Sequence, residues 1–347
     1  MLSTNMARGG AETQVALVAG ELRRRGHRVD VVSLLPPSAY AAELQAADVG
    51  LQAPGLARIA FTLAKLRPEI LHCHMFHANL AGRLLGTVLP FPAIISTLHS
   101  TAESKAGTGG QLRARDFVYR LTNGLADAVV GVSTAVVDRH RSAHAIRTAR
   151  VIPNGIDTGR FHPASRDQRA RMRAALGLTN EFTWIAVGRL MWKKNFQALL
   201  RAFPADSGTA LLLVGAGPDE PELRASAGPN IRFLGERTDI PDLLGAADAY
   251  VISSTVEGLP LALLEAAACG LPCLATDVGG IRETGIGFVL QNSSELADGL
   301  RHVQSLTPEQ RTALGQAGRT IVESRFSLSA VATEWENLYR ELLTAST

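Results

Sequence analysis

Short apolar runs alternate with amphipathic helical patterns along most of the chain, and this alternation restricts the possible folds more than any other feature. A run of about four to eight apolar residues is typical of a strand that is buried on both faces. Strands that alternate with helices form parallel sheets covered by helices, so we expect an α/β fold. The buried strands are expected at Val29–Leu34, Ile70–His74, Ala93–Thr97, Ala128–Ser133, Thr183–Val187, Ala210–Val214, Ile231–Leu234, Ala249–Ser253 and Cys273–Thr276.

The helical patterns and the length of the chain together predict two domains. A chain of 347 residues is longer than one hydrophobic core usually supports. Each half has the pattern of a Rossmann-like doubly wound layer, and a cleft between two such layers is a natural ligand site. We place the first domain at residues 1–163, the second at 174–325, and a polar linker at 164–173. Helices are expected at Glu12–Arg25, Leu56–Leu66, Phe196–Ala202 and Leu261–Cys269.

The start of the chain departs from this regular alternation. Gly9-Gly10 has the character of a turn between a first strand and a first helix, yet only eight residues precede it. We therefore expect the first strand to be missing, or reduced to residues within Met1–Thr4.

Composition excludes several classes of protein. The content of 46% hydrophobic and 19% charged residues is that of an ordinary globular protein. The sequence has neither a secretory signal nor the run of about 18 apolar residues that a transmembrane helix needs. Its three cysteines, an odd number, indicate no disulfide framework, so we expect a cytoplasmic protein. Only 5% of the residues are aromatic, which argues against nucleic-acid binding.

Charge is distributed unevenly between the two halves. Residues 1–165 hold 18 Lys or Arg against 11 Asp or Glu, whereas residues 166–347 hold 17 against 21. A basic first half suits an anionic partner, such as a membrane surface or a lipid-phosphate acceptor, and would place the protein at the inner face of the membrane. The alternative is a solvated surface with scattered arginines.

The segment Glu257–Glu265 is the strongest local signal for a binding site. A strand runs into a loop and then into a helix, whose first amides could bind a diphosphate, while Gly258 lets the backbone approach a ligand closely. Glu257 would lie at the mouth of the cleft and Glu265 two turns into the helix, where both carboxylates could accept hydrogen bonds from sugar and ribose hydroxyls. A plain surface role for Glu265 is less favoured, because apolar residues surround it.

The segment Gly188–Asn195 is the second signal. A strand ends at Gly188 and delivers Arg189 and Lys194 into the loop before the next helix, at the edge of the sheet where ligands bind. Two fixed cations could neutralise a leaving diphosphate, a role often taken by a divalent metal. The sequence contains no Asp-x-Asp pair, so we expect no metal.

These motifs, in this order, resemble a retaining GT-B glycosyltransferase of glycosyltransferase family four. The resemblance covers nearly the whole chain. It implies a metal-independent hexosyltransferase that moves a hexose or N-acetylhexosamine from a nucleoside-diphosphate sugar to a glycan or lipid-linked acceptor. It also implies that residues 326–347 form a helix that crosses back to the first domain. The matching motifs are Gly-Gly-Ala-Glu at 9–12, Ser-Thr-Leu-His at 96–99, Gly-Val-Ser at 131–133, Pro-Asn-Gly-Ile-Asp at 153–157, the two segments above, and Asp-Val-Gly-Gly at 277–280.

The resemblance also implies roles for individual residues. Arg189 and Lys194 would hold the diphosphate and stabilise its departure, and the diphosphate itself would help to deprotonate the acceptor hydroxyl. His99 would lie near the reacting sugar, and Glu257 would contact its hydroxyls. The donor would be bound by Gly9, Gly10, Gly258, Leu259, Pro260, Leu261, Glu265 (at the ribose) and Arg237 (beside the base).

Two other functions and two other sites are compatible with parts of the sequence. A nucleotide-sugar epimerase of the same fold, or a catalytically silent nucleotide-sugar-binding subunit, would share the donor-site motifs. His72, Cys73, His74 and His77 could form a metal cluster, but no further Cys/His set lies nearby. Residues 215–218 resemble a dinucleotide fingerprint without its full glycine spacing, and a simple turn is the favoured interpretation.

Overall fold

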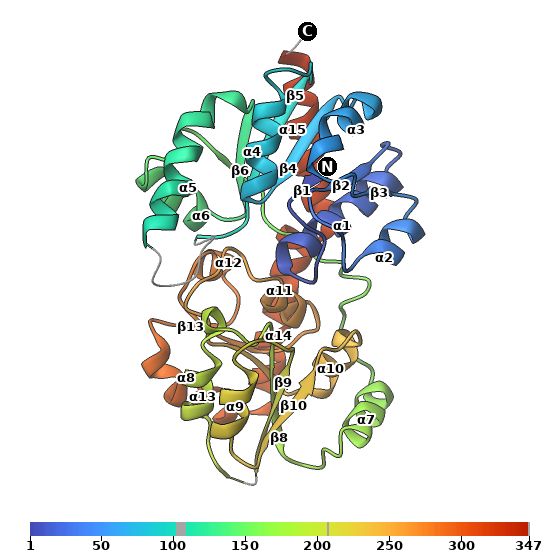
Figure 1. The fold of residues 1–347 in the computed structure, drawn as a ribbon. Helices are drawn as coiled ribbons and strands as arrows, with labels where there is room; N and C mark the ends of the chain where they lie inside the picture. Colours follow the sequence, from blue (N-terminus) through green and yellow to red (C-terminus); the bar gives the residue numbers. More distant parts are fainter. Residues whose placement is uncertain (102–108, 207, 346–347) are drawn as a thin grey trace. The chain divides into compact units, whose positions relative to one another are not determined.

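The computed structural model describes residues 1–101, 109–206 and 208–345. The chain divides into two compact units, and each is a parallel sheet with helices packed on it (Figure 1). The N-terminal unit comprises Met1–Gly155 together with Leu328–Thr347, and the C-terminal unit comprises Ile156–Ser327. The expected α/β class with two doubly wound sheets is confirmed.

The N-terminal unit is built on a seven-stranded parallel sheet with the order β3-β2-β1-β4-β5-β6-β7. Its buried strands read as continuous apolar runs because helices cover both faces. Fully buried Leu71, Ile95 and Val130 belong to three neighbouring strands. The strands are β1 (Leu2–Ser3), β2 (Asp30–Ser33), β3 (Gly50–Gln52), β4 (Ile70–His74), β5 (Ala93–Leu98), β6 (Ala128–Gly131) and β7 (Arg150–Val151).

The first strand is present and central, although it has only two residues. Leu2 pairs with Val32 of β2 on one side and with Cys73 of β4 on the other. The amide of Val32 donates to the carbonyl of Met1 at 2.8 Å, and the amide of Leu34 donates to the carbonyl of Ser3 at 2.9 Å. Two neighbouring strands thus hold β1 in register and fix where the following loop begins.

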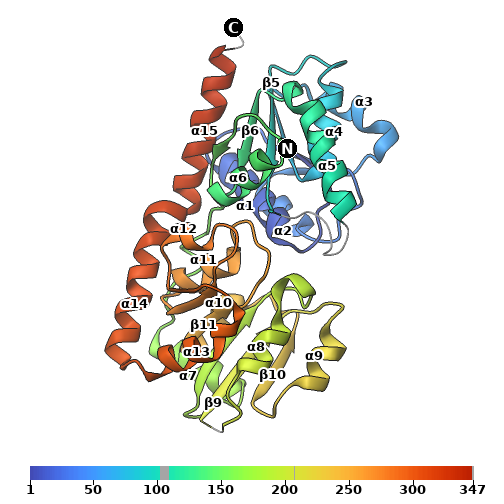
Figure 2. The ribbon, with the colours of Figure 1, turned by 90° about the vertical axis from the view of Figure 1, so that its left-hand side faces the viewer.

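The helices of the N-terminal unit pack on this sheet. The expected helix 56–66 consists of a 3-10 turn, Leu56–Arg58, followed by α3. The last helix, α15, runs beside α1 and buries Val331, Trp335 and Leu338 (Figure 2). The helices are α1 (Gly10–Arg24), α2 (Ala41–Ala46), α3 (Ile59–Leu66), α4 (Phe76–Leu85), α5 (Gly109–Thr122), α6 (Thr134–Ser142) and α15 (Leu328–Ala345), with a 3-10 turn at Asn123–Leu125.

The C-terminal unit is built on a six-stranded parallel sheet with the order β10-β9-β8-β11-β12-β13. Its core includes the fully buried Trp184, Leu211 and Val251. The strands are β8 (Phe182–Val187), β9 (Thr209–Val214), β10 (Ile231–Gly235), β11 (Ala249–Ile252), β12 (Cys273–Thr276) and β13 (Phe288–Leu290). The helices are α7 (Arg166–Ala175), α8 (Phe196–Ala202), α9 (Glu220–Ser226), α10 (Ile240–Ala246), α11 (Leu261–Ala268), α12 (Ile281–Thr284), α13 (Leu296–Ser305) and α14 (Pro308–Ile321), with 3-10 turns at Trp192–Lys194 and Ser293–Glu295 and a π-helical turn at Val322–Phe326.

Residues 164–173, which we expected to form a linker, largely belong to helix α7. Ser165 starts the helix with a capping box: its hydroxyl accepts from the amide of Gln168, and the Gln168 side chain accepts from the amide of Ser165. Arg169 and Arg173 bind Asp248 at 2.7 and 3.4 Å. The stretch is polar because α7 lies on the surface, where it packs against α10.

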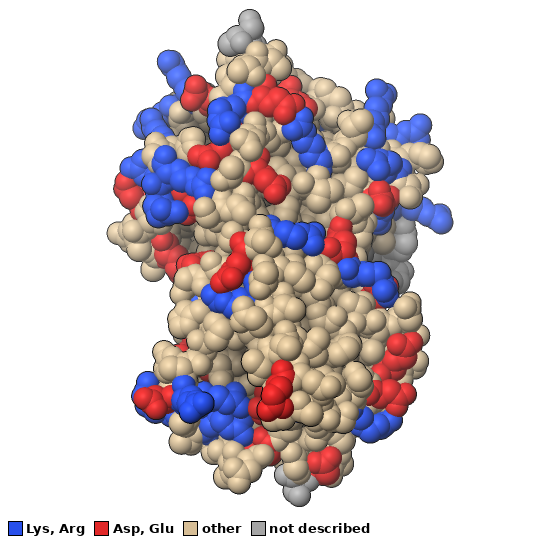
Figure 3. Space-filling view, turned by 180° about the vertical axis from the view of Figure 1, so that it is seen from behind, with Lys and Arg blue, Asp and Glu red and all other residues tan. Residues whose placement is uncertain are grey.

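Three properties of the described residues bear on the expected class of protein. None of the helices in the described part of the chain is long and apolar enough to cross a membrane. The three cysteines are free and buried. Seen from behind, basic and acidic side chains are scattered over a surface that consists mostly of other residues (Figure 3).

Candidate functional site

Three loops of the C-terminal unit follow the carboxyl ends of the neighbouring strands β8, β11 and β12. In a parallel sheet these ends meet at one edge, where ligands bind. Hydrogen bonds join the loops to one another: the amide of Thr255 donates to the carbonyl of Lys193 at 2.8 Å, and the Ser253 hydroxyl donates to the carbonyl of Lys194 at 2.8 Å. The loop after β8 and the loop after β11 therefore form one connected surface.

Within this surface the structure brings Lys194 and Glu257 together. The Nζ atom of Lys194 lies 2.6 Å from Oε1 of Glu257, and the Ser254 hydroxyl donates to the same oxygen at 2.6 Å. The exposed fractions of the two side chains are 20% and 12%, so the pair is largely shielded from water. A partly buried, hydrogen-bonded ion pair holds both groups in fixed positions. Ser254 carries no motif signal, and only the structure shows its contact with Glu257.

The loop after β12 packs against the backbone of the loop that carries Glu257. Gly279 has a left-handed backbone with φ of 56°, and a Cβ atom there would lie 2.3 Å from the carbonyl oxygen of Glu257. The amide of Gly280 donates to the carbonyl of Gly258 at 2.7 Å. The motif at 277–280 is thus explained by a close approach between two backbones that only glycine allows.

The turn at 215–218 has a similar supporting role. Gly215 has a φ of 132°, and its missing Cβ would lie 2.1 Å from the carbonyl oxygen of Gly188. The amide of Gly188 donates to the carbonyl of Val214, and the amide of Leu190 to the carbonyl of Ala216, at 2.9 and 3.0 Å. This segment therefore packs behind the loop that carries Arg189.

Glu265 lies in an unusual setting on α11. The helix begins at Leu261 without a side-chain cap, and Leu261, Leu263 and Leu264 are buried. The Glu265 side chain keeps partial exposure, but no described residue hydrogen-bonds to its carboxylate. Burial raises the pKa of Glu265 to about 7, opposed by the charge of Arg160. A carboxylate that is desolvated without a protein partner has free acceptor capacity for a ligand.

Tyr250 on β11 is a polar residue of this region that the sequence analysis did not single out. Its hydroxyl is buried and has no hydrogen-bond partner among the described residues. Burial, together with the charges of Cys273, Glu257 and Glu265, raises its pKa well above the usual range. The hydroxyl is therefore a neutral donor near the two carboxylates.

The other predicted donor-site residues of this unit lie in different surroundings. Arg189 is exposed and makes no ion pair in the part of the chain that the structure describes. Arg237 instead binds Asp239, with Nε 2.8 Å from Oδ1. Gly258, Leu259 and Pro260 are buried in the loop that leads into α11.

In the N-terminal unit, the predicted residues Gly9 and Gly10 lie at the start of α1. Gly9 is the N-cap residue, in extended conformation, and no side chain caps the helix. Its carbonyl accepts from the amide and the hydroxyl of Thr13 at 2.9 and 2.8 Å. The first turn of a helix of this length presents amide groups and the positive end of the helix dipole.

His99 follows β5 and belongs to a cluster of histidines. Its Nε2 lies 3.1 Å from Nδ1 of His74, whose ring packs 4.0 Å from that of His72. His72 bonds to the hydroxyls of Tyr339 and Thr97 at 2.7 Å each, so both of its nitrogens are engaged. Burial lowers the pKa of His99 to about 4 and lowers those of His72 and His74 well below their usual values. The cluster is a network of neutral imidazoles.

Comparison with known protein families finds a matching family model for each of the two units. The model described as Glycosyltransferase Family 4 matches residues 8–160, and the model described as Glycosyl transferases group 1 matches residues 181–305. Together the two matches cover most of the chain.

Relatives and solved structures agree with this assignment. The chain is 33% identical, over 61% of its length and 61% of the relative's, to a GDP-mannose-dependent monoacylated alpha-(1-6)-phosphatidylinositol monomannoside mannosyltransferase of Corynebacterium glutamicum. It is 28% identical, over 79% of both chains, to an alpha-maltose-1-phosphate synthase of Mycolicibacterium smegmatis. The matched region spans about three fifths of the length of the first of these relatives.

Two solved structures share the fold over nearly their whole length. Anabaena HepE in complex with UDP has a TM-score of 0.83 at 23% identity, with 98% of each chain covered. Sucrose-phosphate synthase of Thermosynechococcus elongatus has a TM-score of 0.80 at 21% identity, with 99% of each chain covered. The motifs, the two wound sheets and these matches lead to one conclusion: the chain belongs to the GT4-type glycosyltransferases and has a GT-B fold.

Proposed function

We propose that this protein is a retaining glycosyltransferase that moves a hexose or N-acetylhexosamine from a nucleoside-diphosphate sugar to a hydroxyl of a glycan or glycolipid. The observation that carries the proposal is the Lys194–Glu257 pair at the carboxyl edge of the second sheet. It places a cation and a carboxylate side by side, in the same unit as Arg189, which makes no ion pair with any described residue. The relatives named above, which are transferases and synthases of sugar compounds, support the same class of reaction.

In the proposed reaction the two cations stabilise the departing diphosphate. Lys194 and Arg189 bind its oxygens. The bond from the anomeric carbon to the diphosphate breaks, and these two side chains neutralise the negative charge that develops on the diphosphate. The acceptor oxygen forms its bond to the anomeric carbon on the same face, and its proton passes to the diphosphate. The two side chains supply the charge that a divalent metal supplies elsewhere, so we propose that no metal is needed.

Glu257 and Glu265 would bind different parts of the donor. Glu257 is held by Lys194 and Ser254 and would contact hydroxyls of the transferred sugar. Glu265 would accept hydrogen bonds from the ribose hydroxyls, which would replace the water that burial removes. His99 is neutral at physiological pH and would act as a hydrogen-bonding group, with His74 fixing its orientation.

We further propose that the protein works in the cytoplasm at the inner face of a membrane, on a lipid-linked acceptor. The excess of basic residues in the first half of the chain supports this location. The name of the C. glutamicum relative includes a phosphatidylinositol mannoside, which is a lipid acceptor. Sedimentation with vesicles tests the location: the protein should bind anionic vesicles and not neutral ones, and equal binding to both contradicts it.

Thermal shifts test the donor site. UDP, GDP, ADP and their sugars are added in EDTA to the wild type, to Glu265→Ala and to the control Glu222→Ala, an exposed position on α9. We expect one nucleotide series to stabilise the wild type and the control but not Glu265→Ala. The absence of a shift with every nucleotide contradicts the proposal, and so does an unchanged shift in Glu265→Ala.

A further inference from the structure

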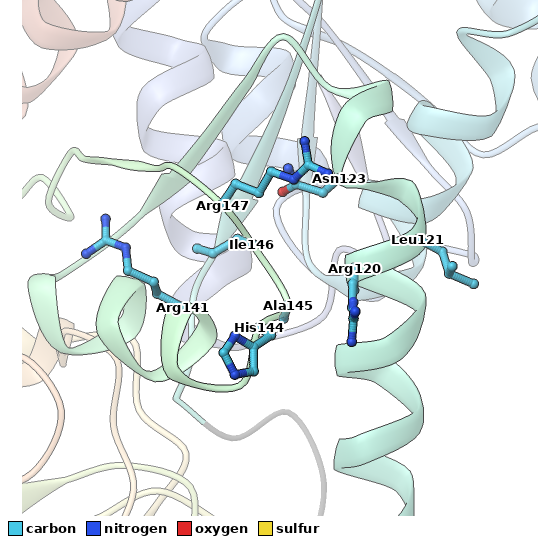
Figure 4. A pocket seen from close by; sticks show the side chains of 8 residues that line it. All are labelled: Arg120, Leu121, Asn123, Arg141, His144, Ala145, Ile146 and Arg147. Carbon is cyan, nitrogen blue, oxygen red and sulfur yellow. The ribbon is translucent and has the colours of Figure 1, made fainter.

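A basic cavity opens on the N-terminal unit, and none of the residues assigned to the donor site lines it. Its volume is about 840 Å³, and it lies between the end of α5 and the segment that follows α6 (Figure 4). Arg120 comes from α5, Arg141 from α6, and Arg147 from the segment beyond it. His144 and Asn123 also line it. The described residues that form its wall include three arginines and no carboxylate.

The positive charge of this cavity is poorly compensated. Arg120 and Arg147 are exposed and make no ion pair in the described part of the chain. Asp116, one turn before Arg120 on α5, is bound by Arg139 at 2.9 Å. Arg141 pairs with Asp138 at 3.1 Å, but both side chains are more than half exposed, so this pair is weak. Concave surfaces lined by one sign of charge concentrate the electric field.

A buried guanidinium is hydrogen-bonded to the segment that forms part of the cavity wall. Arg83 of α4 is fully buried, and its hydrogen-bond partners are neutral: Ser96 at 3.0 Å and Thr122 at 3.1 Å. Its Nη2 has no partner among the described residues. Thr122 lies between two residues of the cavity wall. A buried charge without a counter-ion is costly, and an anion nearby would offset that cost.

The surface view is consistent with a local concentration of positive charge. Basic side chains gather along the edge of the N-terminal unit on the side of α5 and α6, whereas both signs are mixed over the rest of that face (Figure 3). The rim of the cavity also carries an apolar group. Leu121 is 67% exposed, and Phe117, one turn earlier on the same face of α5, is 58% exposed.

We propose that this cavity is a binding site for a phosphate-bearing anion. Guanidinium groups match phosphate oxygens with paired hydrogen bonds. Arg120 and Arg147 make no ion pair with any described residue, so this capacity is available in both. Leu121 of the cavity wall, and the exposed Phe117 one turn before it on α5, fit the part of a lipid that adjoins its headgroup. The phosphate is therefore carried either by a free polyphosphate or by a lipid headgroup. The site is separate from the proposed donor site, because none of the residues assigned to donor binding lines it.

The test compares a cavity variant with a control of equal charge. Arg120→Gln/Arg147→Gln removes two cations of the cavity wall. Arg166→Gln/Arg171→Gln removes two exposed arginines from α7 of the other unit, and these too form no ion pair within the described residues. Neither pair is buried, so both full-length variants should keep the melting temperature of the wild type. Inorganic pyrophosphate is titrated by calorimetry in an Arg189→Ala/Lys194→Ala background, which removes the cations of the donor site. Sedimentation with phosphatidylcholine vesicles, with and without phosphatidylglycerol, is the second arm.

We expect the cavity variant to bind pyrophosphate or anionic vesicles at least about tenfold more weakly than the control does, because each lost charged hydrogen bond weakens binding. Pyrophosphate binding that is lost in the cavity variant identifies a free anion as ligand. Binding only to phosphatidylglycerol vesicles, lost in the same variant, identifies a lipid headgroup. The inference is overturned if neither probe binds, if the cavity variant binds as well as the wild type, or if both variants lose binding equally.

Discussion

The ammonium group of Lys194 and the carboxylate of Glu257 lie 2.6 Å apart, although 63 residues separate them in the sequence. Lys194 ends a 3-10 turn after β8, and Glu257 lies in the loop after β11, two strands that are hydrogen-bonded neighbours. The contact fixes the cation proposed to bind the diphosphate and the carboxylate proposed to bind the sugar in one arrangement. A change in either side chain should therefore affect both tasks.

Lys194→Ala should abolish most of the transfer activity. The variant loses a cation at the departing diphosphate and leaves the Glu257 carboxylate without its partner, so we expect kcat to fall at least about 100-fold. Lys193→Ala is the matched control, since Lys193 lies beside it in the same turn, and its kcat should change by less than about threefold. Steady-state release of the nucleoside diphosphate measures both. Equal rates for the two variants would remove Lys194 from the mechanism.

Glu265→Gln should make the protein more stable at alkaline pH. Burial raises the pKa of Glu265 to about 7, above its unfolded value of 4.5. The folded state therefore binds the proton more tightly, and stability from this group falls as the pH rises from 4.5 to 7. Allowing for partial exposure, we expect Glu265→Gln to gain about 1–2 kcal/mol at pH 8 and nothing at pH 4.5. Urea unfolding at the two pH values measures this, and an equal gain at both would contradict the assignment.

Donor affinity should depend on the same ionisation. A carboxylate accepts hydrogen bonds from ribose hydroxyls more strongly than a carboxylic acid does, so binding favours the deprotonated form of Glu265. Affinity of the wild type should be constant above pH 8 and fall by up to about tenfold per unit below the pKa near 7. Calorimetric titrations from pH 5.5 to 8.5 test this, and Glu265→Gln should show a flat profile. A wild-type profile without a break near 7 would exclude Glu265 as the ribose ligand.

Gly279→Ala should displace the Glu257 loop. A Cβ atom at Gly279 meets the carbonyl oxygen of Glu257 at 2.3 Å and has an unfavourable φ of 56°, so we expect a loss of about 1–3 kcal/mol and weaker donor binding. Gly285→Ala is the control that distinguishes backbone strain from a steric clash. Gly285 has a similar φ of 74°, but the atom nearest to a Cβ at this position would lie 3.8 Å away. This variant should lose stability without losing affinity for the donor. Equal donor affinity in the two variants would contradict the supporting role of Gly279.

The sequence predicted the buried strands well and the short ones poorly. Ile70–His74 and Cys273–Thr276 have the predicted bounds, because strands covered on both faces are continuous apolar runs. The short strands Gly50–Gln52, Arg150–Val151 and Phe288–Leu290 have no such signal, and only pairing with a neighbour makes them strands. Helix α7 was mistaken for a linker because none of its residues is buried.

At the site, the sequence could indicate residues but not their contacts. The motifs pointed to Lys194 and Glu257 separately, whereas their ion pair depends on the order of the strands in the sheet. The role of Gly279 depends on a backbone approach from another loop. The unpartnered hydroxyl of Tyr250 could not be found either, since a tyrosine in a buried strand is an ordinary packing residue.

The central claim is transfer with retention from a nucleoside-diphosphate sugar, and proton NMR of the reaction tests it most directly. The protein is incubated in EDTA with the α-linked donor whose nucleotide gives the thermal shift, with and without glycan and lipid-linked acceptors. We predict release of the nucleoside diphosphate together with a product whose new linkage has the α anomeric configuration of the donor. A β-linked product, an isomerised nucleotide sugar without release of diphosphate, or a donor left intact with every acceptor would contradict it.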